Sequence, residues 1–219
     1  MTDFAAARRM MVDGQIRTVD VTDLRLQSAM LEVERERFVP PAQRAMAYLD
    51  RDIPVTDGAR PARRLPKAMV LARMIQTAAI EPTERVLDVG CATGYSAAIL
   101  ARVAAAVTAI EEDTELFAAA QAALAGLDNV KIVNGPLAAG WPAAAPYDVI
   151  LLDGATEIAP RTLLSQLREG GRLVCVLGRE PMGKGTVYRM VGGHVTAQPV
   201  FDAAAPLLPG FAKPAEFVF

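Results

Sequence analysis

The chain has 219 residues, 52% of them hydrophobic and 22% charged, and its 23 basic and 25 acidic side chains leave a net charge of -2. This balance argues against the broad basic face that nucleic-acid binding requires. Two cysteines, Cys91 and Cys175, are too few and too far apart for a disulfide framework or a zinc site, so we expect no metal and a reducing, cytoplasmic setting. Neither a signal peptide nor a membrane-spanning run is predicted, and hence no membrane partner.

Two helices are predicted at the N-terminus, over residues 4–16 and 23–34, with Thr22 as the N-cap of the second. Pro40 and Pro41 end this helical region, because a proline disfavours helical geometry in the residue before it. Residues 50–66 then lose periodicity and gather prolines and arginines. They predict a long surface loop, the kind of segment that often carries function.

From Glu84 onward, short β-branched runs alternate with alanine-rich helical runs, the pattern of a parallel sheet with crossover helices. We expect a Gly170-Gly171 turn before the last core strand and a later antiparallel hairpin punctuated by Gly183 to Gly185 and by Gly192-Gly193. The only histidine, His194, follows that second glycine pair and is interpreted as structural, which removes His-based catalysis. The predicted strands are residues 85–89, 107–111, 130–133, 148–152 and 172–177, and the predicted helices are 95–103, 114–124 and 161–167.

The fold class that follows is α/β, a doubly wound and mostly parallel sheet with an N-terminal helical extension and a C-terminal antiparallel hairpin. We divide it into residues 1–66, the extension with a loop facing the substrate, and residues 67–219, the α/β domain, as one compact unit.

The most informative stretch is residues 86–95, where a strand runs through a small-residue turn into a helix. Gly90 and Gly94 let the backbone turn sharply and approach a ligand, and the helix presents unpaired N–H groups to an anion. The next strand ends at Glu111-Glu112, where an acidic side chain can accept both hydrogen bonds of a ribose diol. A nucleoside cofactor is therefore predicted.

The identity of that cofactor depends on departures from the dinucleotide fingerprint. Tyr95 stands where the third glycine belongs, and no tyrosine has a lysine four residues later, which makes a nicotinamide oxidoreductase the weaker alternative. An Asp-Val-Gly-x-x-x-Gly loop, here beginning at Asp88, instead resembles the cofactor loop of class I S-adenosylmethionine-dependent methyltransferases, which have a Rossmann-like fold.

The flanking residues narrow the resemblance to the protein-L-isoaspartate O-methyltransferase family, whose motifs they match in order over most of the chain. The resemblance implies S-adenosyl-L-methionine as the cofactor and methylation of isoaspartyl carboxylates in protein repair. The matching segments are Met11-Val12-x-x-Gln15-Ile16-Arg17, Arg37-Phe38-Val39-Pro40-Pro41, Ala47-Tyr48, Asp52-Ile53-Pro54, residues 86–98 and Gly170-Gly171-Arg172-Leu173-Val174.

Carried over by position, the resemblance implies three groups of cofactor contacts. Ala92 replaces the usual middle glycine of the loop, which is tolerable if its φ is negative, and Pro136 replaces the usual aspartate near adenine. The implied contacts are Asp88, Gly90, Cys91, Ala92, Gly94 and Tyr95 at the methionine end, Glu111 with Glu112 at the ribose, and Gly135, Pro136 and Leu137, after Asn134, beside adenine.

The substrate side departs further from the family pattern. Where the family reads Thr-Ile-Ser-Gln-Pro, residues 62–66 read Ala-Arg-Arg-Leu-Pro, which we align with Arg64 at the hydroxyl position. Asp153-Gly154-Ala155 replaces the usual Thr-Ala-Ala. Arg64 and Asp153 are the candidate catalytic residues, although Asp153 is equally placed to cap the next helix. The neighbouring Arg60, Arg63 and Lys67 either join the substrate loop or form a solvated basic face.

The predicted function is O-methylation of a carboxylate in a peptide or protein, a reaction that needs no general base because the acceptor is ionised at neutral pH. Since Arg64 puts a long cation where a small hydroxyl is usual, we expect weak methylation of isoaspartyl peptides. The alternative is a non-catalytic relative that binds S-adenosylmethionine or a partner protein. The oligomeric state is not predicted.

Overall fold

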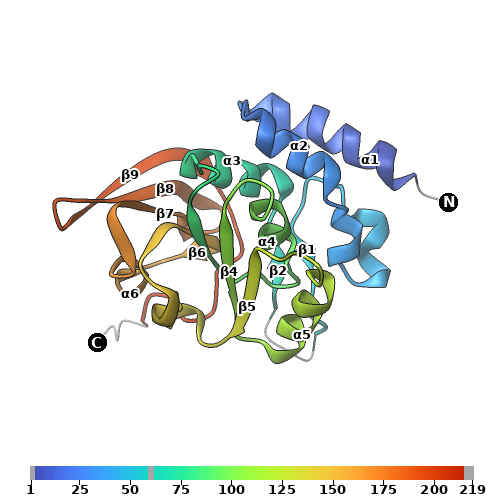
Figure 1. The fold of residues 1–219 in the computed structure, drawn as a ribbon. Helices are drawn as coiled ribbons and strands as arrows, with labels where there is room; N and C mark the ends of the chain where they lie inside the picture. The colour runs from blue at the N-terminus through green and yellow to red at the C-terminus, as the bar shows by residue number, and fades with distance from the viewer. Residues whose placement is uncertain (1–2, 59–61, 215–219) are drawn as a thin grey trace, which may run out of the picture.

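The computed structural model describes residues 3–58 and 62–214. Its centre is a seven-stranded sheet with the order β5-β4-β3-β6-β7-β8-β9, in which the first five are parallel and the last two antiparallel. This is the predicted doubly wound sheet with its C-terminal hairpin (Figure 1). The strands are β3 Arg85–Val89, β4 Ala106–Glu111, β5 Val130–Asn134, β6 Tyr147–Thr156, β7 Leu167–Arg179, β8 Met182–Val191 and β9 His194–Ala203.

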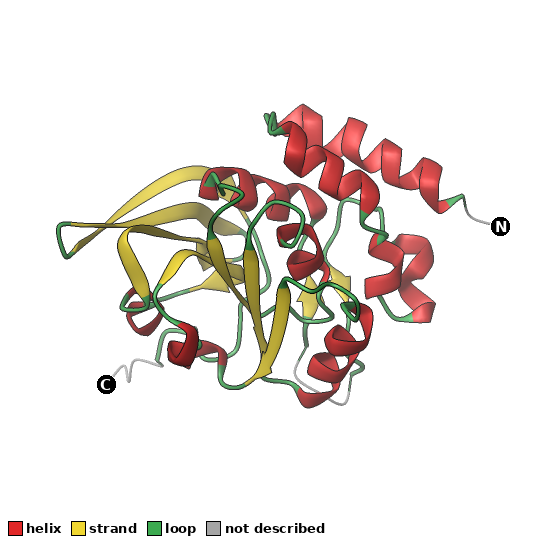
Figure 2. Ribbon diagram, viewed as in Figure 1, coloured by secondary structure: helices red, strands yellow, loops and turns green. Residues whose placement is uncertain are grey.

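Helices cover the two faces of the sheet unequally. On one face, the larger apolar core lies between the sheet and the N-terminal segment together with helices α3, α4 and α5. On the other face, a smaller apolar cluster lies between the sheet and α6. Figure 2 shows most of the helices on the side of the N-terminus, short helical segments near the C-terminus, and the long strands of the hairpin projecting away from the N-terminus. The helices are α1 Phe4–Met11, α2 Leu24–Glu32, α3 Ala68–Ala78, α4 Tyr95–Leu100, α5 Thr114–Ala123 and α6 Arg161–Leu164.

The N-terminal extension is built as predicted, with local corrections. A π-helical turn, Val12–Ile16, continues α1 to the expected residue 16. The N-cap of α2 is Asp23 and not Thr22, because the Asp23 carboxylate accepts from the N–H groups of Arg25 and Leu26. Short 3-10 turns complete the extension at Arg17–Val19, Arg35–Phe38 and Pro41–Met46.

The loop of residues 50–66 contains a two-stranded ribbon, formed by β1 Ile53–Pro54 and β2 Arg64–Leu65. Helix α3, which follows it, was not predicted, although the apolar spacing within Ala68–Ala78 is helical and leaves Val70, Leu71, Met74 and Ile75 buried.

Two predictions near the last core strand were wrong. Helix α6 ends at Leu164, and Leu167 already belongs to β7. Gly170-Gly171 does not precede that strand but forms an irregularity inside it, where the register with β6 shifts between Leu167 and Arg172. The Gly192-Gly193 turn between β8 and β9 was predicted correctly, and both glycines have a positive φ.

The topology fixes where a ligand can bind. The chain leaves β3 towards β4 on one side, whereas β6 pairs with β3 on the other side. In open α/β sheets the crevice lies at such a switch point, outside the carboxyl ends of the strands. No helix in the described part of the chain is long and apolar enough to cross a membrane.

Candidate active site

Three carboxylates meet at the carboxyl ends of neighbouring parallel strands. Asp88 belongs to β3, Glu111 ends β4, and Asp153 lies within β6. All three are buried, with exposed fractions of 0%, 0% and 3%. The sheet places them together because the strands run parallel in the order β4-β3-β6.

The loop between β3 and α4 carries the backbone conformation that its glycines suggested. Gly90 has φ +84 and Gly94 has φ +96. A side chain at Gly94 would strike Leu124 Cδ1 at 2.7 Å, so this glycine is needed for packing as well as for its conformation. Ala92 has φ +50, so the negative φ that would make alanine tolerable in place of the usual glycine is not adopted. An alanine in the left-handed region costs about 1–2 kcal/mol, so this loop is strained.

The Glu111 side chain is held by five hydrogen bonds. Oε1 accepts from Arg63 Nη1 at 2.6 Å and from the backbone N–H groups of Glu112 and Asp113 at 2.9 and 3.1 Å. Oε2 accepts from Arg63 Nη2 and from the Ala92 N–H, both at 2.8 Å. Arg63 Nη2 also donates to the Gly90 carbonyl at 3.2 Å. Glu111, the residue predicted to accept hydrogen bonds from the cofactor ribose, therefore forms a buried bidentate ion pair with Arg63 of the substrate loop.

Asp88 and Asp153 form a second feature of the site. Ser96 Oγ, in the first turn of α4, donates to Asp88 Oδ2 at 2.7 Å. The other oxygen of Asp88 and Oδ1 of Asp153 are buried without a hydrogen-bond partner. Burial raises the pKa of Asp88 well above its usual value, and the charge of Asp153 adds to this effect. Burial likewise raises the pKa of Asp153, to about 6.

Asp153 does not cap the next helix, because α6 begins at Arg161 behind Pro160 and has no side-chain cap. That alternative for Asp153 is therefore wrong. The neighbouring Gly154 has a packing explanation, since a Cβ there would lie 2.7 Å from Leu208 Cγ and 2.8 Å from the Pro206 carbonyl. The C-terminal segment thus lies directly over the ends of β3 and β6.

A buried arginine stands beside the loop. Arg35 is fully buried, and its guanidinium lies over the Tyr95 ring at 4.5 Å from the centroid. It donates to the carbonyls of Ala47 and Pro66, while its Nη1 and the Tyr95 hydroxyl have no hydrogen-bond partner. The site therefore includes unpartnered donors as well as unpartnered acceptors.

The residues predicted beside adenine lie next to Glu111. The Gly135 N–H donates to the Glu111 carbonyl at 3.2 Å, and the Leu137 N–H donates to Glu112 Oε2 at 3.2 Å. Pro136 lies between them and is exposed. The structure thus brings Gly135 and Leu137 into contact with Glu111 and Glu112, while contact of this segment with adenine stays a prediction.

The basic residues of the substrate loop divide in two. Arg64 is exposed, pairs with Pro54 in the ribbon and lies outside the carboxylate cluster, and its substrate-facing role stays a prediction. Arg63 is buried within the cluster. Lys67 is half-buried and precedes α3, whereas Arg60 lies outside the described residues.

Two other side chains named from the sequence differ in position, because Cys91 lies within the loop from Gly90 to Gly94 and His194 lies in the hairpin. Cys91 is fully buried, and burial raises the pKa of its thiol, as expected of a space-filling residue. His194 is exposed at the start of β9.

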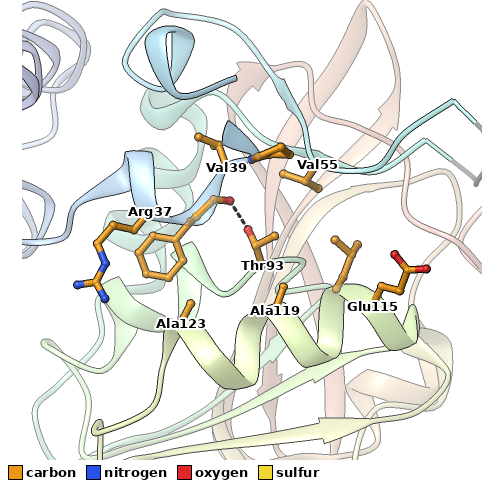
Figure 3. A pocket seen from close by; sticks show the side chains of 10 residues that line it. Arg37, Val39, Val55, Thr93, Glu115, Ala119 and Ala123 are labelled. Carbon is orange, nitrogen blue, oxygen red and sulfur yellow. Dashed lines mark hydrogen bonds between the residues drawn. The ribbon is translucent and has the colours of Figure 1, made fainter. Parts of the chain in front are cut away.

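A cavity of about 240 Å³ adjoins the loop through Thr93, whose hydroxyl donates to the Phe38 carbonyl at 2.5 Å. Figure 3 shows it between the N-terminal segment, which contributes Val39 and Val55, and helix α5. Arg37 and Glu115 stand at its two ends.

The sequence interpretation missed Arg63, Ser96, Arg35 and Leu208 as parts of the site. A signal for Arg63 was present: side chains in an extended segment alternate, so the apolar Leu65 and Arg63 share one face while Arg64 takes the other. Ser96 lies only eight residues from its partner Asp88, within the matching segment 86–98, whereas Arg35 and Leu208 were not recognisable because the residues they contact in the site are distant in the sequence.

Comparisons with known proteins agree with this geometry. The family model for protein-L-isoaspartate(D-aspartate) O-methyltransferase matches residues 7–195. A protein-L-isoaspartate O-methyltransferase of Methylorubrum populi is 41% identical over 191 residues, which are 87% of this chain and 86% of that protein.

Two solved structures share the fold. One, titled protein-L-isoaspartate O-methyltransferase, has a TM-score of 0.80 at 23% identity and covers 93% of this chain and 66% of its own. A Plasmodium falciparum structure, titled a putative enzyme of this kind in complex with S-adenosyl-L-homocysteine, has a TM-score of 0.76 at 15% identity over 94% and 97% of the two chains. The sequence motifs match those of the family, and the structure places their carboxylates together at the strand ends. The chain belongs to the protein-L-isoaspartate O-methyltransferase family.

Proposed function

We propose that this protein is an S-adenosylmethionine-dependent O-methyltransferase that methylates a carboxylate in a peptide or protein. The observation that carries the proposal is the cluster of Asp88, Glu111 and Asp153 around the loop from Gly90 to Gly94 at the switch point of the sheet. The family supports the same activity. No observation favours the alternative of a non-catalytic relative.

The residues present fit the cofactor. Its sulfonium and α-ammonium groups are cationic, and the site offers three buried carboxylates against one guanidinium in contact with them. Glu111 would accept the ribose hydroxyls, and the unpartnered oxygens of Asp88 and Asp153 would accept from the α-ammonium. Buried acceptors without partners are rare in proteins, and a bound donor would satisfy both.

When bound, the cofactor supplies an activated methyl group. The protein then has to hold the acceptor carboxylate in line, since a carboxylate is already ionised at neutral pH. Such positioning can contribute roughly 7–11 kcal/mol to catalysis. A chain with one exposed histidine can therefore carry out this reaction without a general base.

For the acceptor, the proposal extends to a peptide that lies along the cavity between the N-terminal segment and α5. The apolar wall suits a side chain, and Arg37 and Glu115 at the ends suit the polar groups of a peptide. Arg64 and Asp153 remain the candidate substrate-side residues. We further propose a cytoplasmic setting, supported by two buried free thiols, with no nucleic-acid or membrane partner.

The test is a transfer assay with labelled S-adenosylmethionine against an isoaspartyl peptide, its ordinary aspartyl isomer and the proteins of a cell extract. We expect base-labile methyl esters on peptide or protein carboxylates. We expect slower transfer to the isoaspartyl peptide than with an authentic family member assayed alongside, and faster transfer by Arg64→Ser. Absence of both transfer and S-adenosylhomocysteine binding would overturn the proposed function.

A further inference from the structure

The carboxylate that should hold the ribose has no capacity left for it. Two carboxylate oxygens offer about four lone-pair positions. Those of Glu111 already accept five hydrogen bonds, two of them from Arg63 and three from backbone N–H groups. A ribose diol donating to Glu111 must therefore displace a donor already present.

We propose that Arg63 competes with the cofactor ribose for Glu111, so that cofactor binding expels its guanidinium from the site. This inference rests on the proposed function. Arg63 is the donor that can leave, because the three N–H groups belong to the backbone of the loops that build the site, whereas Arg63 contributes a long side chain from another segment.

The position of the guanidinium supports direct competition for space. Arg63 Nη2 donates to the Gly90 carbonyl and lies 3.5 Å from where a Cβ on Gly90 would stand, slightly farther away than Leu208 Cδ1 at 3.0 Å. Ala92 stands at the middle position of the loop, where the backbone approaches a ligand most closely, and its N–H donates to the same Glu111 oxygen as Arg63 Nη2. The guanidinium therefore fills the space beside the loop as well as the hydrogen bonds of Glu111.

The charge balance allows the exchange. Removing Arg63 alone would leave Glu111 buried without a countercharge, which is costly. S-adenosylmethionine brings a sulfonium and an α-ammonium cation together with one α-carboxylate into the same cluster, and S-adenosylhomocysteine brings the α-ammonium and the α-carboxylate. The Arg63 guanidinium thus neutralises Glu111 when no cofactor is bound and leaves when the cofactor binds.

The backbone at Arg63 is anchored independently of its side chain. Its N–H donates to Thr56 Oγ1 at 2.9 Å, and its carbonyl accepts from the Val55 N–H at 2.9 Å. The β1–β2 ribbon can therefore keep its register while the guanidinium swings out.

The experiment measures S-adenosylhomocysteine binding by calorimetry to the full-length protein, Arg63→Met and Arg51→Met. Arg51 is an exposed arginine in the same part of the chain and serves as the matched control. Affinity falls in proportion to the fraction of molecules competent to bind, so we expect Arg63→Met to bind at least about 10-fold more tightly and Arg51→Met within about twofold of the parent. Arg63→Lys, which keeps the charge but cannot form the bidentate pair, should lie between them.

A second readout follows the guanidinium itself. The side-chain ¹⁵N resonances lost in Arg63→Met identify Arg63 in the spectrum of the parent protein. Addition of S-adenosylhomocysteine should move them to the positions of exposed arginines. Circular dichroism establishes that each variant is folded, and Arg63→Lys replaces Arg63→Met if the latter is not.

The outcomes separate the two proposals. Equal or weaker binding by folded Arg63→Met, or unmoved Arg63 resonances at saturation, overturns the competition and leaves the proposed function standing. Absence of binding to the parent and to every variant overturns both. Binding by Arg63→Met alone would support both.

Discussion

Two buried arginine–carboxylate pairs lie at opposite ends of the sheet. They differ in how many hydrogen bonds the carboxylate keeps when its arginine is removed. At the amino end, Arg172 forms a bidentate pair with Glu84. At the carboxyl end, Arg63 forms a bidentate pair with Glu111. The four residues are all at most 7% exposed, so burial alone does not distinguish the two pairs.

The remaining hydrogen bonds of the four side chains distinguish the two pairs. Arg172 also donates to the carbonyls of Ala78 and Ala79, which end helix α3 and have no helical partner. Without Arg172, Glu84 retains one hydrogen bond, from the Glu81 N–H. Glu111 without Arg63 retains three. The first pair holds the fold together, whereas the second can be exchanged for a ligand.

The largest expected effect is on stability. Arg172→Met should lower the free energy of unfolding by about 3–5 kcal/mol, because two carbonyls lose their partner and Glu84 keeps only the Glu81 N–H and the Arg168 guanidinium at 3.6 Å. Arg63→Met should cost less, about 2–3 kcal/mol, because Glu111 loses its countercharge but keeps three backbone donors. Urea denaturation monitored by circular dichroism measures both, and similar losses would remove the distinction between the two pairs.

The two ends should also respond oppositely to pH. The raised pKa of Asp153 means that the folded protein binds more protons than the unfolded chain between pH 4 and pH 6, so its contribution is present at low pH and lost as pH rises to about 6. Asp88, Glu111, Arg35 and Arg63 are the charged groups around it. Asp153→Asn should remove this loss, gaining up to about 2–3 kcal/mol over the parent by pH 7.

At the amino end the sign is reversed. Burial opposes ionisation of Glu84, but its hydrogen bonds from Arg172 and from the Glu81 N–H, together with the charges of Arg172 and Arg168, outweigh this, and its pKa is lowered. The stability from this pair is present at neutral pH and lost as pH falls through the folded pKa. Urea denaturation of the parent and Asp153→Asn from pH 4 to 8 tests the comparison. A constant difference between them would contradict the assignment to Asp153.

A smaller effect concerns ligand affinity. Glu111→Gln should weaken S-adenosylhomocysteine binding by about 1–3 kcal/mol, the scale of lost hydrogen bonds to a charged group. The matched control is Glu84→Gln, which changes the same residue type at the other end of the sheet. It should leave the affinity unchanged in the folded protein while lowering the urea midpoint. Weakened binding in both variants would show that the effect is not local to Glu111.

The smallest effect concerns two alanines in the left-handed region, one near each pair. Ala79 has φ +47 at the end of α3, and Ala92 has φ +50 in the loop that contacts Glu111. Each replacement by glycine should raise the free energy of unfolding by about 0.5–1 kcal/mol, because the relief of strain exceeds the extra entropy of the unfolded chain. Thermal unfolding measures both. Only Ala92→Gly should also change the affinity for S-adenosylhomocysteine.

The elements that the sequence predicted are those with local causes. The five parallel strands and the turn at Gly192-Gly193 follow from β-branched runs and glycine pairs, and their positions agree with the structure to within a few residues, except where β6 and β7 extend further. The errors near Leu167 and Gly170 have a non-local cause, since the pairing of β7 with β6 overrides the helical pattern of residues 161–167.

The residues of the site likewise divide into those with local causes in the sequence and those with non-local causes. The sequence by itself determined the loop from Gly90 to Gly94 and the acid Glu111, because a strand, a turn and the next strand end are defined by residues close together in the chain. Only the tertiary structure decided that Arg63 and not Arg64 enters the cluster, and that Arg172 and Glu84 meet across 88 residues. The alternation of residues 63–65 places Arg63 and Arg64 on opposite faces, but which partner each face meets depends on the surfaces that the folded sheet brings together.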